Sequence, residues 1–221
     1  MDRPGYGLIE TMRVREGRIP FLPRHLARLE RSLSELGLPK PSQDLAALVT
    51  PFSATGDAVL RLEVRDGRAS VTVRAPPPVE TPAVIAASQA HRPYRHKTTE
   101  RDCFVDAAGE ANRAEADDAL LLTHDGCVAE GTVCSVFWWD GDLLRTPTLD
   151  LGILPGIGRA RVLELAARVD QGRYARHALA GKSLFLTNAV RGVVPIASLD
   201  GLPVLLDPRT AELAEGFWPP A

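Results

Sequence analysis

The chain has 221 residues, of which 45% are hydrophobic and 24% are charged, and its formal net charge is −2. This composition is typical of a globular protein with a sizeable core, arranged as one large domain or two small ones. The balanced charge argues against a nucleic-acid partner. No apolar run approaches the ~20 residues that span a bilayer, and the first residues lack the basic and apolar regions of a signal peptide. We therefore expect a cytoplasmic protein without a nucleic-acid or membrane partner.

The first part of the chain predicts a β-hairpin followed by a helix. Strand-like runs at residues 8–14 and 19–22 flank the turn sequence REGR. The next stretch, RHLARLERSLSELGLP, is amphipathic, because apolar residues recur at steps of three and four residues. These residues are Leu26, Leu29, Leu33 and Leu36. Gly37 and Pro39 are expected to end the helix.

A second hairpin and a proline-rich segment follow. After a short helix predicted at residues 43–49, AVLRLEVRDGRASVTVRA contains two β-branched runs joined around Asp66 and Gly67. Residues 76–82, PPPVETP, have little periodicity and are expected to be extended. We place a domain boundary in this segment. The prediction is a small α+β domain at residues 1–80 and a larger domain at residues 81–221.

The larger domain is predicted to be rich in strands. AVIAAS predicts a strand, and residues 100–113 predict a helix. The run DALLLTHDGCVAEGTVCSVFWWDGDLLRTP predicts a meander with Asp-Gly turns at 125–126 and 140–141. GIGRARVLELAARV predicts a glycine-led helix, and SLFLTNAVRGVVPI predicts a strand that runs into a loop.

Metal chemistry is not expected from the cysteine and histidine spacing. Cys103, Cys127 and Cys134 follow no C-x-x-C pattern, and the five histidines form no i, i+4 ligand pair. We interpret the cysteines as reduced, buried thiols.

Two residues are candidates for chemistry. Lys97, in YRHKTTERDCF, is either a solvated charge or an amine that attacks a carbonyl. The second role requires partial burial, which lowers the pKa of the amine so that it can form a Schiff base. Glu130, in VAEGTVCSVFWWDG, is either an edge-strand carboxylate facing water or a carboxylate that keeps a heteroaromatic nitrogen protonated. Local spacing leaves both pairs of alternatives open.

An anion site is suggested by GILPGIGRARV, where a glycine-rich turn leads into a helix. Such a helix start directs backbone N–H groups and the positive end of the helix dipole at a phosphate or carboxylate. The spacings of a P-loop and of a dinucleotide fingerprint are absent from the sequence. Arg28, beside the leucine stripe, is either a solvated arginine or a further anion ligand. A lysine, a strand carboxylate, a glycine-led helix and an arginine together suit a phosphorylated pyridine aldehyde.

Four segments, in this order, resemble the class IV pyridoxal-phosphate aminotransferases. The segments are ETMRVREGRIPFLPRHLARLERS, HKTTERD, DDALLLTHDGCVAEGTVCSVFWWDGDLLRTP and GILPGIGRARVLEL. The family includes branched-chain and D-amino-acid aminotransferases and aminodeoxychorismate lyase. The resemblance implies the two-domain α+β fold of D-amino-acid aminotransferase, with a small α/β N-terminal domain and a larger β-rich C-terminal domain. It also implies pyridoxal 5'-phosphate as cofactor, a small-molecule substrate and a homodimer.

The resemblance implies a role for each candidate residue. Lys97 would be the Schiff-base lysine, and Glu130 would keep the pyridine nitrogen protonated, which makes the ring an electron sink. The phosphate would be held by the Arg28 side chain, the backbone N–H groups of Ile157 and Gly158, and the loop at Asn188 and Ala189. The candidates for binding substrate carboxylates, which could equally be ordinary surface residues, are Thr11, Arg13 and Arg191.

Two motifs favour the lyase within this family. HKTTERD resembles the HKTTDR of aminodeoxychorismate lyases, and TNAVRG resembles their NALRG, where aminotransferases have a Ser/Thr-rich loop. The implied reaction converts 4-amino-4-deoxychorismate to p-aminobenzoate and pyruvate, with Lys97 moving the proton. An aminotransferase acting on D-amino or branched-chain amino acids is the first alternative. A non-catalytic member that binds a phosphate or a partner is the second.

The sequence departs from the family pattern at three places. Only MDRPGYG precedes LIET, where family members have a further strand, so either one strand is missing or the start is compact. Ser135 stands where the family often has asparagine, and Gly158 replaces the usual threonine. The second change removes a hydroxyl contact to the phosphate but keeps the N–H. We expect these changes to weaken cofactor binding.

Overall fold

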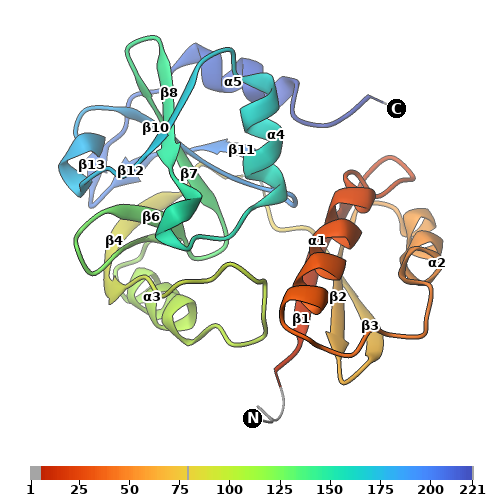
Figure 1. Cartoon of the computed structure of the whole chain (residues 1–221). Coiled ribbons are helices and arrows are strands. Elements are labelled where there is room, and N and C mark those ends of the chain that lie inside the picture. The colour runs from red at the N-terminus through yellow and green to blue at the C-terminus, as the bar shows by residue number, and fades with distance from the viewer. Residues whose placement is uncertain (1–5, 79, 221) are drawn as a thin grey trace. The chain divides into compact units, whose positions relative to one another are not determined.

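The computed structural model describes residues 6–78 and 80–220. They form two compact units, which are described separately (Figure 1). The first unit is Met1–Pro78 with His96–Glu100 and Pro219–Ala221, and the second is Val79–Arg95 with Arg101–Trp218. The segment that carries Lys97 therefore belongs to the first unit, although it follows the proline-rich segment in the sequence. Whether a strand is missing before LIET or the start is compact concerns residues that lie mostly outside the described ones.

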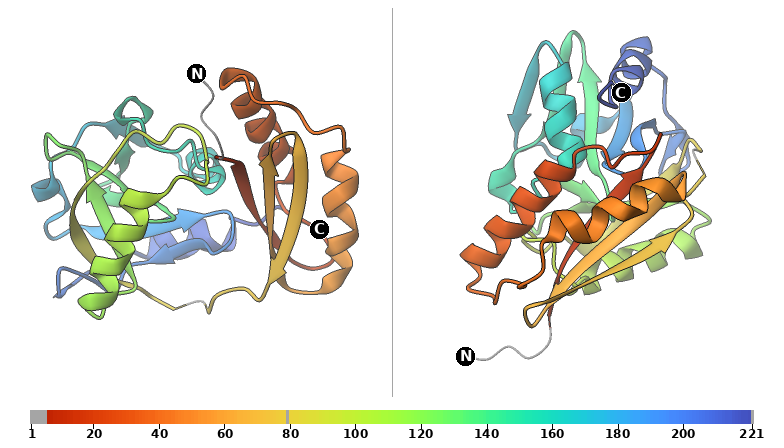
Figure 2. Two further views of the ribbon diagram at one scale, coloured as in Figure 1. Left: turned by 90° about the horizontal axis from the view of Figure 1, so that it is seen from below. Right: turned by 90° about the vertical axis from the view of Figure 1, so that its right-hand side faces the viewer.

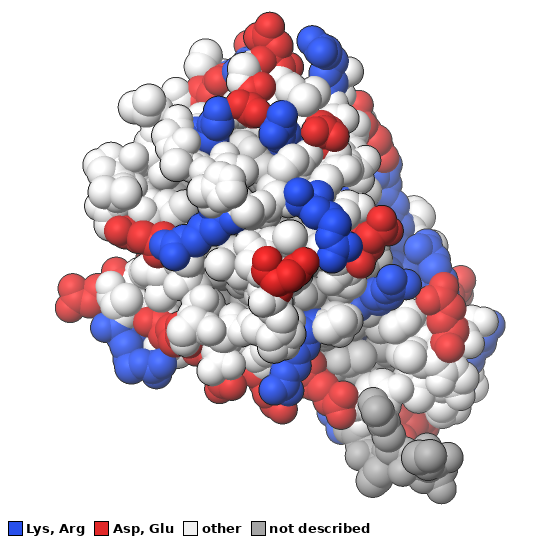
Figure 3. All heavy atoms as spheres, turned by 60° about the vertical axis from the view of Figure 1, so that its left-hand side comes forward, with Lys and Arg blue, Asp and Glu red and all other residues white. Residues whose placement is uncertain are grey.

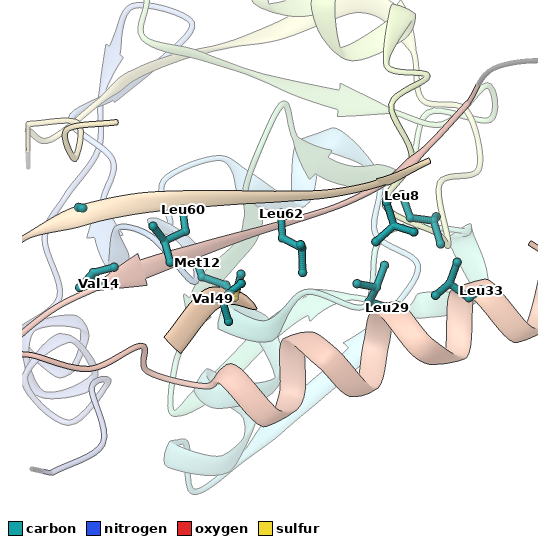
Figure 4. Close-up of a cluster of buried hydrophobic side chains, with 10 residues drawn as sticks. Leu8, Met12, Val14, Leu29, Leu33, Val49, Leu60 and Leu62 are labelled. Carbon is teal, nitrogen blue, oxygen red and sulfur yellow. The ribbon is translucent and has the colours of Figure 1, made fainter. Parts of the chain in front are cut away.

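The first unit is an antiparallel sheet with two helices packed against it. The sheet has the order β1-β2-β3, from β1 (Leu8–Val14), β2 (Ala58–Arg65) and β3 (Arg68–Arg74). The helices are α1 (Leu22–Glu35) and α2 (Leu45–Val49), and α2 continues into the 3-10 helix η1 (Thr50–Thr55). Alternate residues of β1 and β2 face the leucine stripe of α1 and form one buried cluster (Figure 4). The labelled members are Leu8, Met12, Val14, Leu29, Leu33, Val49, Leu60 and Leu62.

The N-terminal hairpin prediction is wrong in its second strand. Arg15 and Arg18 form only an isolated bridge, and α1 already begins at Leu22 with a proline in its first turn. Proline lacks the N–H that a strand ladder uses, but its fixed φ suits the first turn of a helix. Strand β1 pairs with β2 instead. The helices and the hairpin around Asp66 and Gly67 are confirmed, and both turn residues have the positive φ that a tight hairpin requires.

The second unit contains two five-stranded sheets. The first has the order β13-β12-β4-β5-β6 and consists of β4 (Ala83–Ala90), β5 (Asp118–Leu122), β6 (Val128–Gly131), β12 (Ser198–Leu199) and β13 (Leu202–Pro203). The second has the order β11-β10-β7-β8-β9 and consists of β7 (Ser135–Asp140), β8 (Leu143–Pro147), β9 (Val169–Gly172), β10 (Ser183–Asn188) and β11 (Gly192–Pro195). The helices are α3 (Asp102–Arg113), α4 (Ile157–Leu165) and α5 (Pro208–Glu215), with short 3-10 helices η2 (Leu149–Leu151) and η3 (Arg176–Leu179).

Alternation along the strands divides the apolar residues of this unit between two cores. Leu120 of β5 packs with Trp138 of β7 and Leu186 of β10 in the cluster shared by the two sheets. Its neighbours Ala119 and Leu121 point the other way, toward α3, as expected for a strand with a two-residue period. Helix α3 therefore covers one face of β4 and β5 (Figure 2).

The meander predicted over residues 118–147 is confirmed as two hairpins, β5–β6 and β7–β8, but these hairpins do not share one sheet. The chain leaves the first sheet after β6, and β7 pairs with β8 and β10 in the second sheet. Asp118 stabilises the bend between the sheets, because its carboxylate accepts from the backbone N–H and the hydroxyl of Thr132 at 3.1 and 2.5 Å. Residues 183–196 are also a hairpin rather than a strand with a loop, because β10 pairs with β11 around Gly192, whose φ is 78°.

The distribution of surface charge and the apolarity of the helices agree with the balanced charge and ordinary hydrophobic content of the sequence. On the face shown in Figure 3, acidic and basic side chains are interspersed. In the part of the chain that the structure describes, no helix combines the length and the apolarity that a membrane span requires. The α+β class predicted from the sequence is confirmed.

Candidate active site

Lys97 lies on a short segment that runs along the edge strand of the first unit. The N–H of Ile9 donates to the carbonyl of Lys97 at 2.8 Å, and the N–H of Thr99 donates to the carbonyl of Gly7 at 2.8 Å. Leu8 forms an isolated antiparallel bridge with Thr98. The backbone on both sides of Lys97 is thus held by β1, and its side chain is partly buried. A fixed backbone restricts the positions that the amine can reach.

Arg28 is buried beside β1 and pairs with a carboxylate. Its Nε and Nη2 atoms donate to the two carboxylate oxygens of Glu10 at 2.8 and 2.6 Å. The Nδ1 atom of His25 lies 2.7 Å from the same carboxylate, and none of the three residues is more than 6% exposed. The alternative of a solvated Arg28 is therefore wrong.

Charge and burial act in opposite directions in this group of three. Burial alone would raise the pKa of Glu10, but the Arg28 charge and the His25 hydrogen bond outweigh it and lower that pKa to about 2. Burial lowers the pKa of His25, and the charges of Arg28 and Lys97 act in the same direction. His25 is then neutral near pH 7 and donates its Nδ1–H to the Glu10 carboxylate.

Thr11 and Arg13 occupy the opposite face of β1. Side chains alternate along a strand, so these two residues point away from the face that carries Glu10 and Met12. Arg13 donates from Nη2 to Asp57 at 2.8 Å, and its side chain is only 13% exposed.

Glu130 belongs to the second unit and is buried although β6 is an edge strand. Its exposure is 5%, and its Oε1 lies 2.9 Å from Nε2 of His91. The N–H of Leu154 donates to the same oxygen at 3.3 Å. The alternative of a carboxylate facing water is therefore wrong. Nearby, burial lowers the pKa of Arg159 to about 10, and the negative charge of Glu130 opposes this shift.

The first turn of α4 packs directly on the end of β10. Gly156 precedes the helix in an extended conformation and provides no side-chain cap. A Cβ atom on Gly158 would lie 2.7 Å from the Cα of Asn188 and 2.9 Å from Oγ1 of Thr187, so a threonine cannot fit here without a shift. The Thr187 hydroxyl is buried and has no hydrogen-bond partner in the described residues. Backbone N–H groups and an unpaired hydroxyl thus meet at the helix start.

Asn188 shapes the loop that follows β10. Its Oδ1 accepts from the N–H groups of Val190 and Arg191 at 2.9 and 2.8 Å. Its Nδ2 donates to the carbonyl of Val133 at 3.3 Å. Ala189, inside this turn, is buried.

The predicted site residues thus form two groups. The first unit contains Lys97, Arg28, Thr11 and Arg13, and the second contains Glu130, Ile157, Gly158, Asn188, Ala189 and Arg191. Sequence reasoning did not find Glu10, His25, His91 or Thr187. Glu10 carried a usable signal, because it is the one acidic residue in the otherwise mostly apolar strand LIETMRV. His91 carried none, because its partner is 39 residues away.

The structure fits pyridoxal phosphate at two points. Glu130 is a buried carboxylate, which suits a protonated pyridine nitrogen. The start of α4, with Gly158 close to an unpaired hydroxyl, suits a phosphate.

Comparisons with known proteins place this chain in a family that uses pyridoxal phosphate. The amino-transferase class IV family model matches residues 7–199, so the chain belongs to this family, which depends on pyridoxal phosphate. It is 26% identical to an aminodeoxychorismate lyase of Bacillus subtilis, over 89% of this chain and 78% of that protein. It is 31% identical to a "Probable branched-chain-amino-acid aminotransferase" of Thermotoga maritima, over 95% of this chain and 84% of that protein. The PLP-bound "hypothetical aminotransferase" of Mycobacterium tuberculosis has the same fold, with a TM-score of 0.86, 22% identity, and coverage of 96% of this chain and 87% of that one.

Proposed function

We propose that this protein is a pyridoxal-phosphate-dependent lyase that converts 4-amino-4-deoxychorismate to p-aminobenzoate and pyruvate. The observation that carries the proposal is the loop after β10, which resembles the lyase motif and whose shape depends on Asn188. A glycine there would lack the side-chain oxygen that accepts from two backbone N–H groups. The similarity to the lyase of Bacillus subtilis supports the same reaction.

Pyridoxal phosphate, when bound, supplies an aldehyde that bonds an amine and a pyridine ring that accepts electrons. Lys97 would bond the aldehyde in the resting enzyme. The Lys97 amine would also take the proton from the amine-bearing ring carbon of the substrate. Glu130 would keep the ring nitrogen protonated, and the N–H groups of Ile157 and Gly158 would hold the phosphate.

Substrate orientation is assigned to three further residues in the proposal. The two substrate carboxylates would be bound by Arg13 and Arg191, because a guanidinium matches a carboxylate in charge and geometry, and by the hydroxyl of Thr11. Loss of the ring proton makes the ring aromatic as the C–O bond to the enolpyruvyl group breaks. The released enolpyruvate takes up a proton and becomes pyruvate, so the reaction needs neither an oxidant nor a second substrate.

The first experiment is an absorbance spectrum of the protein with added pyridoxal phosphate, before and after borohydride reduction, with mapping of the labelled peptide. We expect a visible band that reduction converts into a stable adduct on Lys97. Lys97→Ala should lose the band and lower turnover by about a thousandfold or more. Lys40→Ala, which changes an exposed lysine, should leave both unchanged. A band that persists in Lys97→Ala would contradict the assignment.

An aminotransferase is the second candidate, because the identity to the Thermotoga maritima protein is 31% over 95% of this chain. The two reactions differ in what one substrate alone produces. A lyase releases an aromatic product from aminodeoxychorismate, whereas an aminotransferase converts the cofactor to its amine form with a D-amino or branched-chain amino acid. A protein that forms no adduct and binds only phosphate would be a non-catalytic family member.

A further inference from the structure

His91 follows strand β4 and is one of the most buried polar residues of the second unit. It is 3% exposed, and its Nε2 atom lies 2.9 Å from Oε1 of Glu130, itself 5% exposed. We propose that His91 is a positioning residue, which holds the Glu130 carboxylate aimed at the ring nitrogen of the cofactor. This inference rests on the proposed function, because it assigns a partner to the residue that binds that nitrogen.

The tautomer of His91 follows from its partner. An ionised carboxylate has no proton to donate, so Nε2 must carry the proton, and Nδ1 then has a lone pair. Nδ1 is buried and makes no hydrogen bond with any described residue. Burying an unpaired polar atom costs about 1–3 kcal/mol. If residue 91 served packing alone, an apolar side chain would avoid this cost. The contact to Glu130 therefore explains why a histidine occupies this position.

Glu130 is held from two elements beside its own strand. His91 reaches it from the end of β4, and Leu154 reaches it from the loop before α4. The buried Arg159 of α4 adds a favourable charge interaction. Hydrogen bonds to a carboxylate are stronger than those between neutral groups. A carboxylate fixed in this way keeps its direction when a ring nitrogen binds to it.

The test compares His91→Leu, which removes the donor, with His91→Gln, whose amide N–H can replace Nε2–H. The readouts are the nitrogen NMR shift of ¹⁵N-labelled pyridoxal phosphate in the protein and the Kd of the cofactor. In His91→Leu we expect the ring-nitrogen signal to move toward the neutral pyridine and the Kd to rise about tenfold or more, the effect of losing a hydrogen bond to a charge. His91→Gln should keep both near wild type. His124→Leu, at an exposed histidine, is the matched control.

Glu130→Gln separates this inference from the proposed function. If Glu130→Gln shifts the nitrogen signal and His91→Leu does not, the role of His91 is overturned. If wild type forms no adduct at Lys97, the proposed function itself fails. Should His91→Leu not fold, His91→Asn, whose amide is too short to reach Glu130, takes its place. Equal nitrogen signals in His91→Asn and His91→Gln would then overturn the inference.

Discussion

The group formed by Glu10, His25 and Arg28 shows how a single residue can have a structural role that its motif does not indicate. The resemblance assigns Arg28 to the cofactor phosphate, and the structure shows that its Nε and Nη2 atoms bind Glu10. Both residues are buried, so each compensates the charge of the other. A variant of Arg28 will therefore change stability as well as any phosphate contact, and its effect on activity alone cannot establish a role in binding.

The stability of the protein should fall with acidification because of this group. The pKa values of Glu10 and His25 are both lower in the folded state, so their contributions are present above the unfolded values of 4.5 and 6.5. As the pH falls, the loss begins below about 6.5 through His25. It continues from 4.5 to about 2 through Glu10, which contributes up to about 3 kcal/mol. Urea unfolding at a series of pH values measures this curve.

Glu10→Gln tests the assignment of the lower part of that curve. The variant leaves Arg28 buried without a carboxylate, so we expect it to be less stable at pH 7 by about 3 kcal/mol. Between pH 4.5 and 2 its stability should then fall less than that of the wild type, because the Glu10 contribution is gone. Glu30→Gln, at an exposed position of α1, should retain the wild-type curve. A wild-type pH dependence in Glu10→Gln would contradict the role of Glu10.

At the level of secondary-structure elements, the contact of α4 with β10 depends on the absence of a side chain at Gly158. A Cβ atom there would meet the backbone of Asn188 at 2.7 Å, and backbone atoms cannot move aside as a flexible side chain can. The close approach explains why a threonine is not accommodated in this chain. It also places the N–H groups at the start of α4 next to the loop that Asn188 shapes.

Gly158→Ala should therefore destabilise the protein by about 1–3 kcal/mol, the usual effect of overpacking. It should also weaken pyridoxal phosphate binding more than pyridoxal binding, because only the former has the phosphate. The control is Gly109→Ala in α3, where the nearest atom to a new Cβ is the flexible end of Arg113 at 3.4 Å. That change should stabilise the helix by about 0.5–1 kcal/mol. Thermal unfolding and cofactor titration measure both effects, and equal behaviour of the two variants would contradict the close packing at Gly158.

At the level of the whole molecule, family membership implies an association that one chain does not show. We predict a homodimer, with a mass twice the 23.9 kDa of the chain. Sedimentation equilibrium over a range of concentrations measures it. A mass of one chain at all concentrations, in a sample that carries the Lys97 adduct, would show that the dimer is not needed for cofactor binding.

The sequence by itself determined the local elements and the family. Apolar periodicity placed α1, α2 and the β2–β3 hairpin, because these depend on residues close together in the chain. Residue type and local context made Lys97, Glu130 and the glycine-led start of α4 candidates for chemistry, and the order of the motifs implied their roles. These residue roles remain predictions, whereas the fold class and the family are confirmed.

Only the tertiary structure decided which distant residues meet. Strand β1 pairs with β2 rather than with residues 19–22, and the supposed meander divides between two sheets. The partners of Glu10 and Glu130 are equally distant, since His25 is 15 residues and His91 is 39 residues away. Local propensity depends on neighbours in sequence, whereas strand pairing and buried charge pairs are chosen by packing across the fold, which leaves no periodic pattern in the chain.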